Sequence, residues 1–284
     1  MTICYINGSF KYKSDANVSI EDRGFNFSDG VYEVMSFYGQ NVINFKKHLK
    51  RLNKSLETLQ IKRPFTNIKT LELIIKKLLK INNLENGYIY LQITRGSAAR
   101  NHIFPNKVEP NFIIFTFSVK YDQKLINNGV SIGLTDDQRW SRCDIKSISL
   151  LPNVLVKQRS LEKNLFESWQ IRGKFITEGS TSNAFIINNK NQILTHPNNN
   201  FILGGVTRDS VIEIAKKNNF NVQEKPFAIS DLKSCREAFL TSTTVKIIPV
   251  IKIDKKKINN GKPGKITKIL IKKYNDFVSS QINE

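Results

Sequence analysis

Strand-type and helix-type hydrophobic patterns alternate along the first 120 residues, and this alternation restricts the fold more than any other feature. The expected strands are residues 3–10, a hairpin turning at Asn7-Gly8, and residues 31–37, 88–95 and 111–117. The expected helices are residues 44–59, capped by Asn44, and residues 66–80. Residues 19–30 and 96–105 are rich in turn formers and are expected to be loops. We therefore predict a small α/β domain over residues 1–120.

The rest of the chain mixes short strands with helices, and the polar residues 121–124 are the best candidate for a linker. The expected strands are residues 129–134, 169–176, 184–187, 192–196, 237–241 and 247–253. The expected helices are residues 152–165, 205–218 and 265–280. Such a mixture favours a partly closed, barrel-like sheet over a doubly wound parallel one. We predict an α+β protein whose second, larger domain covers residues 121–284.

The formal net charge is +20, from 44 Lys and Arg against 24 Asp and Glu. A nucleic-acid-binding footprint would gather its basic residues on one surface, whereas these lysines are spread along the chain together with many Asn and Ile. That composition is typical of an AT-rich genome, so we expect no nucleic-acid partner.

No run of eighteen apolar residues occurs, and the N-terminus shows no secretory pattern, so we expect no membrane partner. The three cysteines, Cys4, Cys143 and Cys235, form no CxxC pair. This argues against a metal site and a disulfide framework, and it favours a reducing cytoplasmic location.

Four separated groups of residues have the chemistry of a pyridoxal phosphate site. They are Lys146, the lone carboxylate Glu178 in a hydroxyl-rich stretch, the glycine-led helix start at Gly205, and Thr241-Ser242-Thr243-Thr244. A lysine can form a Schiff base, an acid can pair with the pyridinium nitrogen, and a helix start with hydroxyl groups can hold a phosphate. Taken alone, Lys146 would be a solvated lysine and Glu178 a turn residue.

The motifs as a set resemble the class IV pyridoxal phosphate-dependent aminotransferases. They are Asp144-Ile145-Lys146-Ser147, Leu151-Pro152-Asn153, Thr177-Glu178-Gly179-Ser180-Thr181-Ser182-Asn183, Gly205-Val206-Thr207-Arg208 and Thr241-Ser242-Thr243-Thr244. The resemblance covers nearly the whole chain, beginning at Glu21-Asp22-Arg23-Gly24. Within the class the chain is most similar to D-amino acid aminotransferases, through Gln92-Ile93-Thr94-Arg95-Gly96, Arg100-Asn101-His102 and Phe104-Pro105.

The resemblance implies pyridoxal 5'-phosphate as cofactor, held mainly by the second domain. Lys146 would form the Schiff base and then move the α-proton, and Glu178 would keep the pyridine nitrogen protonated. The remaining cofactor-binding residues would be Arg51, Leu203, Val206, Thr207, Ser242 and Thr243. Arg51, the helix-start amides and the two hydroxyls would bind the phosphate, and Leu203 would pack against the ring.

For the substrate, the resemblance implies that Tyr32, Arg100 and His102 bind the α-carboxylate. The loop with Arg100 and His102 would reach the neighbouring subunit's site, which implies a homodimer. His48 and His196 are expected to be structural. Phe25 and Ser28 stand where relatives often carry Tyr and Gly, and Gly204 is unusual, so the substrate range is open.

Three activities remain open. The first is transamination of D-amino acids, with D-alanine and 2-oxoglutarate giving pyruvate and D-glutamate, and Arg100 with His102 favours it. The second is branched-chain L-amino acid transamination, and the third is an aminodeoxychorismate lyase of the same fold. A non-enzymatic basic binding protein is a distant fourth, because it would leave Lys146 and Glu178 without a role.

Overall fold

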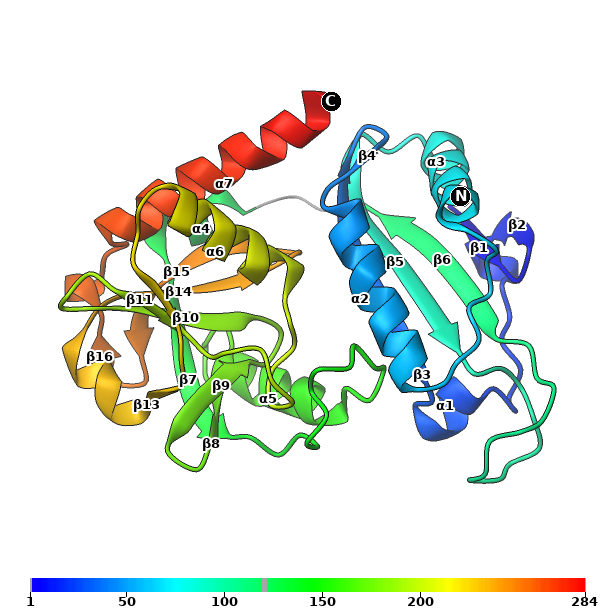
Figure 1. Cartoon of the computed structure of the whole chain (residues 1–284), viewed down its shortest axis with the longest axis horizontal. Coiled ribbons are helices and arrows are strands. Elements are labelled where there is room, and N and C mark those ends of the chain that lie inside the picture. Colours follow the sequence, from blue (N-terminus) through cyan, green and yellow to red (C-terminus); the bar gives the residue numbers. More distant parts are fainter. Residues whose placement is uncertain (1, 119–121, 284) are drawn as a thin grey trace. The chain divides into compact units, whose positions relative to one another are not determined.

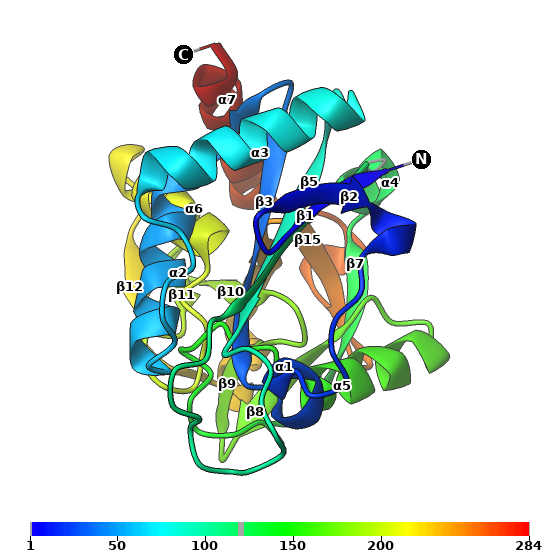
Figure 2. The ribbon, with the colours of Figure 1, turned by 90° about the vertical axis from the view of Figure 1, so that its right-hand side faces the viewer.

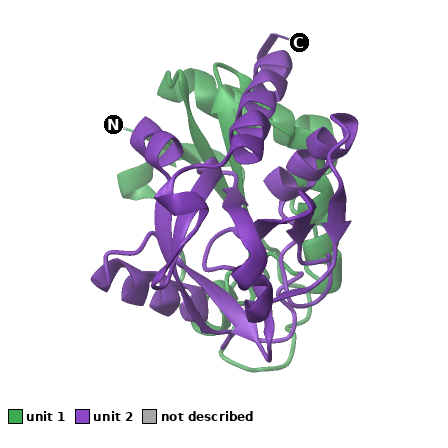
Figure 3. Cartoon of the chain, turned by 90° about the vertical axis from the view of Figure 1, so that its left-hand side faces the viewer, with its two compact units in different colours: residues 1–120, 145–149 green, residues 121–144, 150–284 purple. Residues whose placement is uncertain are grey.

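The fold is described by a computed structural model that covers residues 2–118 and 122–283. The chain forms two compact units, coloured separately in Figure 3. Unit 1 comprises Met1–Lys120 with Ile145–Ser149, and unit 2 comprises Tyr121–Asp144 with Leu150–Glu284. The segment that carries Lys146 is thus grouped with the first unit, although it follows residue 121 in the sequence.

Unit 1 is built on a six-stranded antiparallel sheet with the order β2-β1-β6-β5-β3-β4 (Figure 1). Its strands are β1 (Ile3–Ile6), β2 (Ser9–Tyr12), β3 (Gly30–Tyr38), β4 (Asn41–Val42), β5 (Asn86–Thr94) and β6 (Asn111–Phe117). The expected hairpin is confirmed: Asn7 and Gly8 both have positive φ, 46° and 92°, as a tight turn between β1 and β2 requires. The other expected strands of this half are confirmed as well.

Helices α2 (Phe45–Thr58) and α3 (Ile68–Asn82) cover one face of this sheet (Figure 2). Their leucines and isoleucines recur at helical spacing and form a single core with the strands. Asn44 precedes α2 as expected, although its side chain caps no helix N–H. The expected loop over residues 19–30 contains a short helix, α1 (Arg23–Phe27), because the Asp22 side chain accepts a bond from Phe25 N and starts it.

Unit 2 contains a ten-stranded mixed sheet with the order β12-β11-β10-β14-β15-β7-β8-β9-β13, to which β16 is added beside β15. Its strands are β7 (Val130–Asp136), β8 (Ser168–Arg172), β9 (Phe175–Gly179), β10 (Asn183–Asn188), β11 (Ile193–Thr195), β12 (Val222–Glu224), β13 (Phe227–Ala228), β14 (Cys235–Ser242), β15 (Lys246–Ile253) and β16 (Lys256–Lys257). Strands β9 and β10 are far apart in this order, yet a turn closed by Gly179 N and Ser182 O joins them. The sheet must therefore curl, which confirms the partly closed sheet.

The helices of unit 2 are α4 (Gln123–Asn128), α5 (Leu151–Glu162), α6 (Val206–Lys217) and α7 (Lys265–Asn283). Three short 3-10 turns complete the chain: η1 (Lys13–Asp15) in unit 1, and η2 (Ile229–Ser234) and η3 (Asn259–Gly261) in unit 2. The predicted linker was wrong in part, since α4 begins at Gln123, while residue 121 lies outside the described residues.

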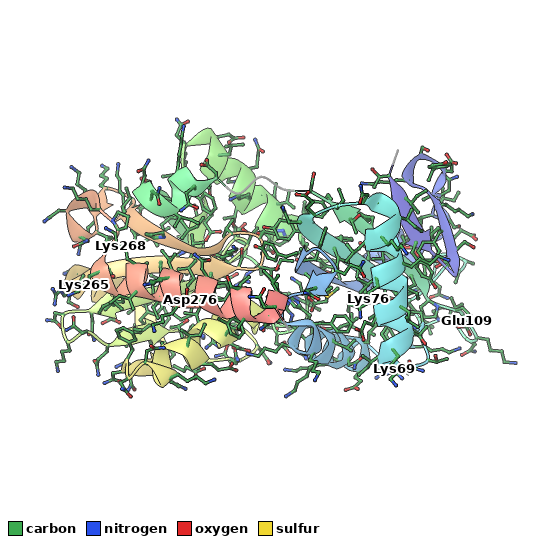
Figure 4. All side chains as sticks on the ribbon, turned by 90° about the horizontal axis from the view of Figure 1, so that it is seen from above. Lys69, Lys76, Glu109, Lys265, Lys268 and Asp276 are labelled. Carbon is green, nitrogen blue, oxygen red and sulfur yellow. The ribbon has the colours of Figure 1, made fainter. Side chains whose placement is uncertain are left out.

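The single strand predicted over residues 169–176 was also wrong. Gly173 adopts a φ of 62° and splits that stretch into β8 and β9, so Glu178 lies on a strand. Among the residues that the structure describes, no helix is long and apolar enough to cross a membrane. Lys69 and Lys76 on α3, and Lys265 and Lys268 on α7, project outward from their helices (Figure 4).

Candidate active site

In unit 1 the structure brings Lys146 and Tyr32 together. The Lys146 Nζ atom lies 4.0 Å from the centroid of the Tyr32 ring, and the lysine is half-buried. Their main chains are joined as well, since Tyr32 N donates to Lys146 O at 3.1 Å, and Ser147 bridges to Val31. Ser55 Oγ accepts a bond from Lys146 N at 3.2 Å. The amine is therefore presented beside an aromatic ring by a backbone that is fixed on two sides.

Tyr32 lies on the face of the sheet opposite α2 and α3. Strand residues alternate between faces, so the Tyr32 face also carries Tyr90 and Phe115, which stack with centroids 4.8 Å apart. Tyr32 stacks on Tyr90 at 5.8 Å. Burial raises the pKa of Tyr90 to about 12, so this hydroxyl stays protonated at neutral pH.

Arg51 belongs to a buried triad with Glu33 and His48. The guanidinium donates from Nε to Glu33 Oε1 and from Nη2 to Oε2, both at 2.8 Å, and His48 Nδ1 lies 2.8 Å from Oε2. Burial alone would raise the pKa of Glu33, but the charge and hydrogen bonds of Arg51 outweigh it and hold this pKa far below its usual range. Burial lowers the pKa of His48. Arg51 is thus fixed in direction by an anionic carboxylate.

Arg100 and His102 gather around one aromatic ring at the surface of unit 1. The Arg100 guanidinium carbon lies 5.1 Å from the Phe27 ring centroid, and the His102 ring lies 5.3 Å from it. Arg23 contacts the same ring at 4.8 Å and donates from Nη1 to the Asn101 carbonyl. Arg100, Asn101 and His102 are all exposed. The two expected carboxylate ligands therefore lie beside one ring in an exposed group that carries the Arg100 charge. Among the described residues no hydrogen bond or ring contact joins Tyr32 to them.

In unit 2 Glu178 lies buried at the end of β9 and accepts bonds from three residues. Arg139 Nη1 donates to Oε1, Asn183 Nδ2 donates to Oε2 at 2.9 Å, and Leu203 N is 3.1 Å from both oxygens. Burial raises the pKa of Glu178 to about 7, although the charge of Arg139 opposes the shift. Two predicted residues, Glu178 and Leu203, are thus in direct contact.

Arg139 is shared between two carboxylates. Its Nε and Nη2 donate to Asp137 Oδ1 and Oδ2, each at 2.9 Å, while only Nη1 serves Glu178. Arg172 Nη2 lies 3.3 Å from Asp137, and Thr177 Oγ1 donates to the same carboxylate at 3.1 Å. Burial would raise the pKa of Asp137, but the hydrogen bonds and charge of Arg139 outweigh it and lower that pKa. Asp137 therefore holds the larger share of this arginine.

The first turn of α6 leaves main-chain N–H groups without a side-chain cap. Gly205 is the N-cap residue, and no side chain caps this end, so the amides of Val206 and Thr207 have no partner within the helix. A Cβ at position 205 would overlap the Asn183 Oδ1 atom, so the chain requires glycine there. Val206 and Thr207 are both buried. Such a helix end, with its partial positive charge, fits a phosphate.

The hydroxyl cluster lies at the end of β14. Thr241 pairs with Asn183 on the neighbouring strand, and its buried Oγ1 has no hydrogen-bond partner among the described residues. Ser242 Oγ lies 3.1 Å from Thr244 Oγ1, and Thr243 is half-buried in the turn that follows. Together with the α6 terminus and Glu178, these groups fit a phosphate ester with a basic ring nitrogen.

The sequence analysis missed the residues that hold Arg51 and Glu178: Glu33, Asp137, Arg139 and Asn183. One of them, Glu33, could have been recognised from the sequence pattern. Glu33 lies in phase with the buried Val31, Met35 and Phe37, so a carboxylate was placed on the core face of a strand. No cluster of three or more metal-ligating side chains occurs within the described part of the chain.

The family model "Amino-transferase class IV" matches residues 30–253. A D-alanine aminotransferase of Staphylococcus haemolyticus is 38% identical over 284 residues and covers 99% of both chains. A D-alanine aminotransferase of Bacillus licheniformis is 40% identical over 262 residues and covers 92% of both.

Among solved structures, the Escherichia coli branched-chain amino acid aminotransferase has a TM-score of 0.91 at 21% identity, covering 99% of this chain and 95% of its own. A branched-chain aminotransferase of the archaeon Thermoproteus uzoniensis, solved with norvaline, has a TM-score of 0.88 at 21% identity, again covering 99% of this chain and 95% of its own. At this identity the two structures establish the fold alone. The family model and the full-length relatives show that this chain belongs to the class IV aminotransferases.

Proposed function

We propose that this aminotransferase uses pyridoxal 5'-phosphate to exchange the amino group between D-amino acids and 2-oxo acids. In its reaction D-alanine and 2-oxoglutarate are converted to pyruvate and D-glutamate. The geometry that supports transamination best is the Lys146 amine, fixed beside the Tyr32 ring. The choice of the D-hand is supported by relatives at 38% and 40% identity that are D-alanine aminotransferases.

In this proposal Lys146 is the catalytic residue of unit 1. Its Nζ atom would bind the cofactor, and the same amine would accept the proton that leaves the substrate α-carbon. When bound, pyridoxal phosphate supplies the electron sink for the carbanion that this proton transfer creates. Arg51 binds the phosphate, and Glu33 keeps its guanidinium in one direction.

Unit 2 supplies the remaining cofactor ligands in this proposal. Glu178 would keep the ring nitrogen protonated, because a buried carboxylate can pair with a pyridinium, and its bonds from Asn183 and Leu203 fix its direction. Leu203 packs on the ring, and the amides of Val206 and Thr207 bind the phosphate at the α6 terminus. Ser242 and Thr243 add hydroxyl donors. We assign the role of small α/β domain to residues 1–120 and that of larger cofactor-binding domain to residues 121–284.

Tyr32, Arg100 and His102 bind the substrate α-carboxylate in this proposal. The exposed Arg100 and His102 side chains act on the neighbouring subunit, so the working form is a homodimer. The Phe27 ring holds both side chains in one direction. We also propose a cytoplasmic location, which is supported by three free cysteines.

The test is a coupled assay of the purified protein with each enantiomer of alanine and glutamate, and with L-leucine and L-isoleucine. We expect D-alanine to react with 2-oxoglutarate while L-alanine does not, and the protein to show the visible absorption of bound cofactor. Lys146→Ala should abolish turnover. Arg100→Ala should raise the KM for D-alanine about ten- to a hundredfold, the worth of one charge-assisted hydrogen bond, and leave the cofactor absorption unchanged.

Two outcomes would redirect the assignment. Turnover of L-leucine or L-isoleucine with D-alanine inert would place the protein among branched-chain aminotransferases. Release of 4-aminobenzoate from aminodeoxychorismate without amino exchange would make it a lyase. An active, coloured Lys146→Ala variant would remove the lysine-based mechanism altogether.

A further inference from the structure

We propose that Glu167 is a positioning residue for the reaction, which holds the turn between β9 and β10 and thereby aligns Glu178 and Asn183. The inference rests on the proposed function, in which Glu178 meets the cofactor ring. Glu167 lies between α5 and β8 and is fully buried. Glu167 belongs to none of the sequence motifs from which the cofactor-binding residues were predicted.

The turn itself connects the two strands that carry the site. Gly179 N donates to Ser182 O at 2.8 Å, so residues 179–182 form a tight reversal. Glu178 directly precedes this turn and Asn183 directly follows it, and their side chains are bonded at 2.9 Å. A shift of the turn therefore moves both groups at once.

Glu167 contacts every hydroxyl group of that turn. Its Oε1 accepts from Ser182 Oγ, and its Oε2 accepts from Ser180 Oγ at 3.4 Å and from Thr181 Oγ1 at 3.2 Å. Thr181 N also lies 3.4 Å from Oε2. A Cβ at Gly179 would overlap the Glu167 carboxyl group, so the carboxyl lies directly against the turn backbone. One side chain thus bonds three consecutive residues of the turn and packs against a fourth, Gly179.

The position of Glu167 is itself fixed by β7. Gly133 N donates to the Glu167 carbonyl at 3.0 Å, and Phe166 N donates to Ser131 O at 2.9 Å. Other groups hold only the turn backbone: Asn153 Nδ2 donates to Ser180 O at 2.8 Å, and Gln170 Nε2 donates to Gly179 O at 3.2 Å. The hydroxyl groups of the turn therefore depend on Glu167.

This carboxyl group is buried without a salt bridge to any described residue. Among the described residues Glu167 forms no ion pair, and the nearby Lys157 donates its Nζ to the Phe166 carbonyl instead. Burial raises the pKa of Glu167, which the Ser182 hydrogen bond and the Lys157 charge only partly oppose. A buried carboxyl without an ion-pair partner costs stability, whereas its bonds to the turn hydroxyl groups give it a positioning role.

The test compares Glu167→Ala, Glu167→Gln and a matched control, Glu237→Ala, on the holoenzyme. Glu237 accepts bonds from Ile266 N, Thr267 N and Thr267 Oγ1 at the start of α7, so it is a structural carboxylate of the same unit. For each variant, kcat and KM for D-alanine are measured. The pH dependence of the cofactor absorption and the thermal unfolding midpoint are also recorded.

We expect Glu167→Ala to lower kcat by roughly a hundredfold, because a small misplacement of the ring-nitrogen partner is costly. KM for D-alanine should stay within about threefold, since the carboxylate ligands are in unit 1. The pH midpoint of the cofactor absorption should shift. Glu167→Gln should restore most of kcat, because a neutral amide can bond the same hydroxyl groups. Glu237→Ala should lower the thermal unfolding midpoint but leave kcat and the pH midpoint of the cofactor absorption unchanged.

Equal effects of Glu167→Ala and Glu237→Ala on kcat and on the absorption midpoint would overturn the inference. If Glu167→Ala does not fold, the double variant Thr181→Ala/Ser182→Ala replaces it, and an unchanged kcat in that variant would be decisive against positioning. The wild-type assay separates this inference from the proposed function. A wild type that converts L-leucine instead refutes the D-amino acid proposal, and the variants are then compared on L-leucine.

Discussion

Each unit of this protein buries a carboxylate against an arginine, but the two carboxylates differ in how strongly they hold a proton. In unit 1, Arg51 donates twice to Glu33, His48 adds a third contact, and the pKa of Glu33 lies far below its usual range. In unit 2, Arg139 gives one N–H to Glu178 and two to Asp137, and the pKa of Glu178 rises to about 7.

We infer that Glu178 keeps its proton more strongly than Glu33 because Arg139 also bonds Asp137 and because the Asp137 charge repels the Glu178 anion. Glu33 accepts two N–H groups of Arg51 and stays an anion, which suits a residue that directs Arg51. Glu178 competes with Asp137 for Arg139, so desolvation prevails. A protonated cofactor nitrogen beside Glu178 would favour its ionised form, so cofactor binding should lower the pKa of this carboxyl.

The largest effect is expected from Glu33→Gln. The amide keeps the shape but removes the charge that accepts two Arg51 N–H groups, and breaking a buried pair in this way costs about 3–5 kcal/mol of unfolding free energy. Urea unfolding of the cofactor-free protein at pH 7 measures it, with Glu178→Gln as the matched control. The control should lose far less, because Asp137 still pairs with Arg139. Equal losses would show that sharing the arginine makes no difference.

For catalysis we expect a large effect from Glu178→Gln, although this variant should lose little unfolding free energy. Glu178→Gln cannot hold the charge of a ring nitrogen, so kcat should fall about a hundredfold, as for other preorganised electrostatic groups. Single-turnover rates with D-alanine at saturating cofactor measure the chemical step directly. A rate within a factor of two of the wild type would assign the ring-nitrogen partner to another residue.

The pH dependence of stability should carry opposite signatures for the two carboxylates. Between pH 4.5 and about 7 folded Glu178 keeps a proton that its unfolded form has released, so the unfolding free energy should fall as pH rises through that range. Glu33 acts in the other direction, because below pH 4.5 only its unfolded form takes up a proton, and stability is lost as pH falls. Urea unfolding across pH 3–8 tests both signs, with Glu178→Gln expected to flatten the upper range alone.

Asp137→Asn should sharpen the sharing argument. Removing the Asp137 charge frees the Arg139 N–H groups for Glu178 and removes a repulsion, so the pKa of Glu178 should fall, by about one unit for a neighbouring charge. The pH range above 4.5 over which the unfolding free energy falls should then end about one pH unit lower. An unchanged range would mean that desolvation alone sets the Glu178 titration.

The sequence could predict what local periodicity and turn chemistry encode. Asn7-Gly8 placed a hairpin correctly, and the two helices of unit 1 lie where their apolar spacing predicted them. The break at Gly173 was missed because the flanking residues continue a strand-like pattern, and a single glycine in a strand also fits a bulge. Roles implied by the family resemblance still await the experiments above.

The supporting residues of the site could not be predicted, because long-range geometry creates them. Asp137 and Arg139 look like a local surface pair, and only the fold brings Glu178, 39 residues from Arg139, against them. Glu167 likewise contacts the turn that begins twelve residues later, at Gly179, because β8 and β9 pair and bring that turn back to it. Glu33 is the exception, since its buried phase on β3 could be read from the alternation.

The smallest effect is expected for a pair that neither unit buries. Lys76 and Glu72 lie 2.9 Å apart at i,i+4 spacing on α3, with 48% and 42% of their side chains exposed. Water solvates both charges in the unfolded chain and largely in the folded one, so Glu72→Gln should change the unfolding free energy by no more than about 0.5 kcal/mol. Added salt should erase even that difference, because exposed charges are screened. The same denaturation assay as for Glu33→Gln measures it. A loss at Glu72 approaching that at Glu33 would mean that total charge on this basic chain, rather than desolvation of a particular pair, sets the energetic cost.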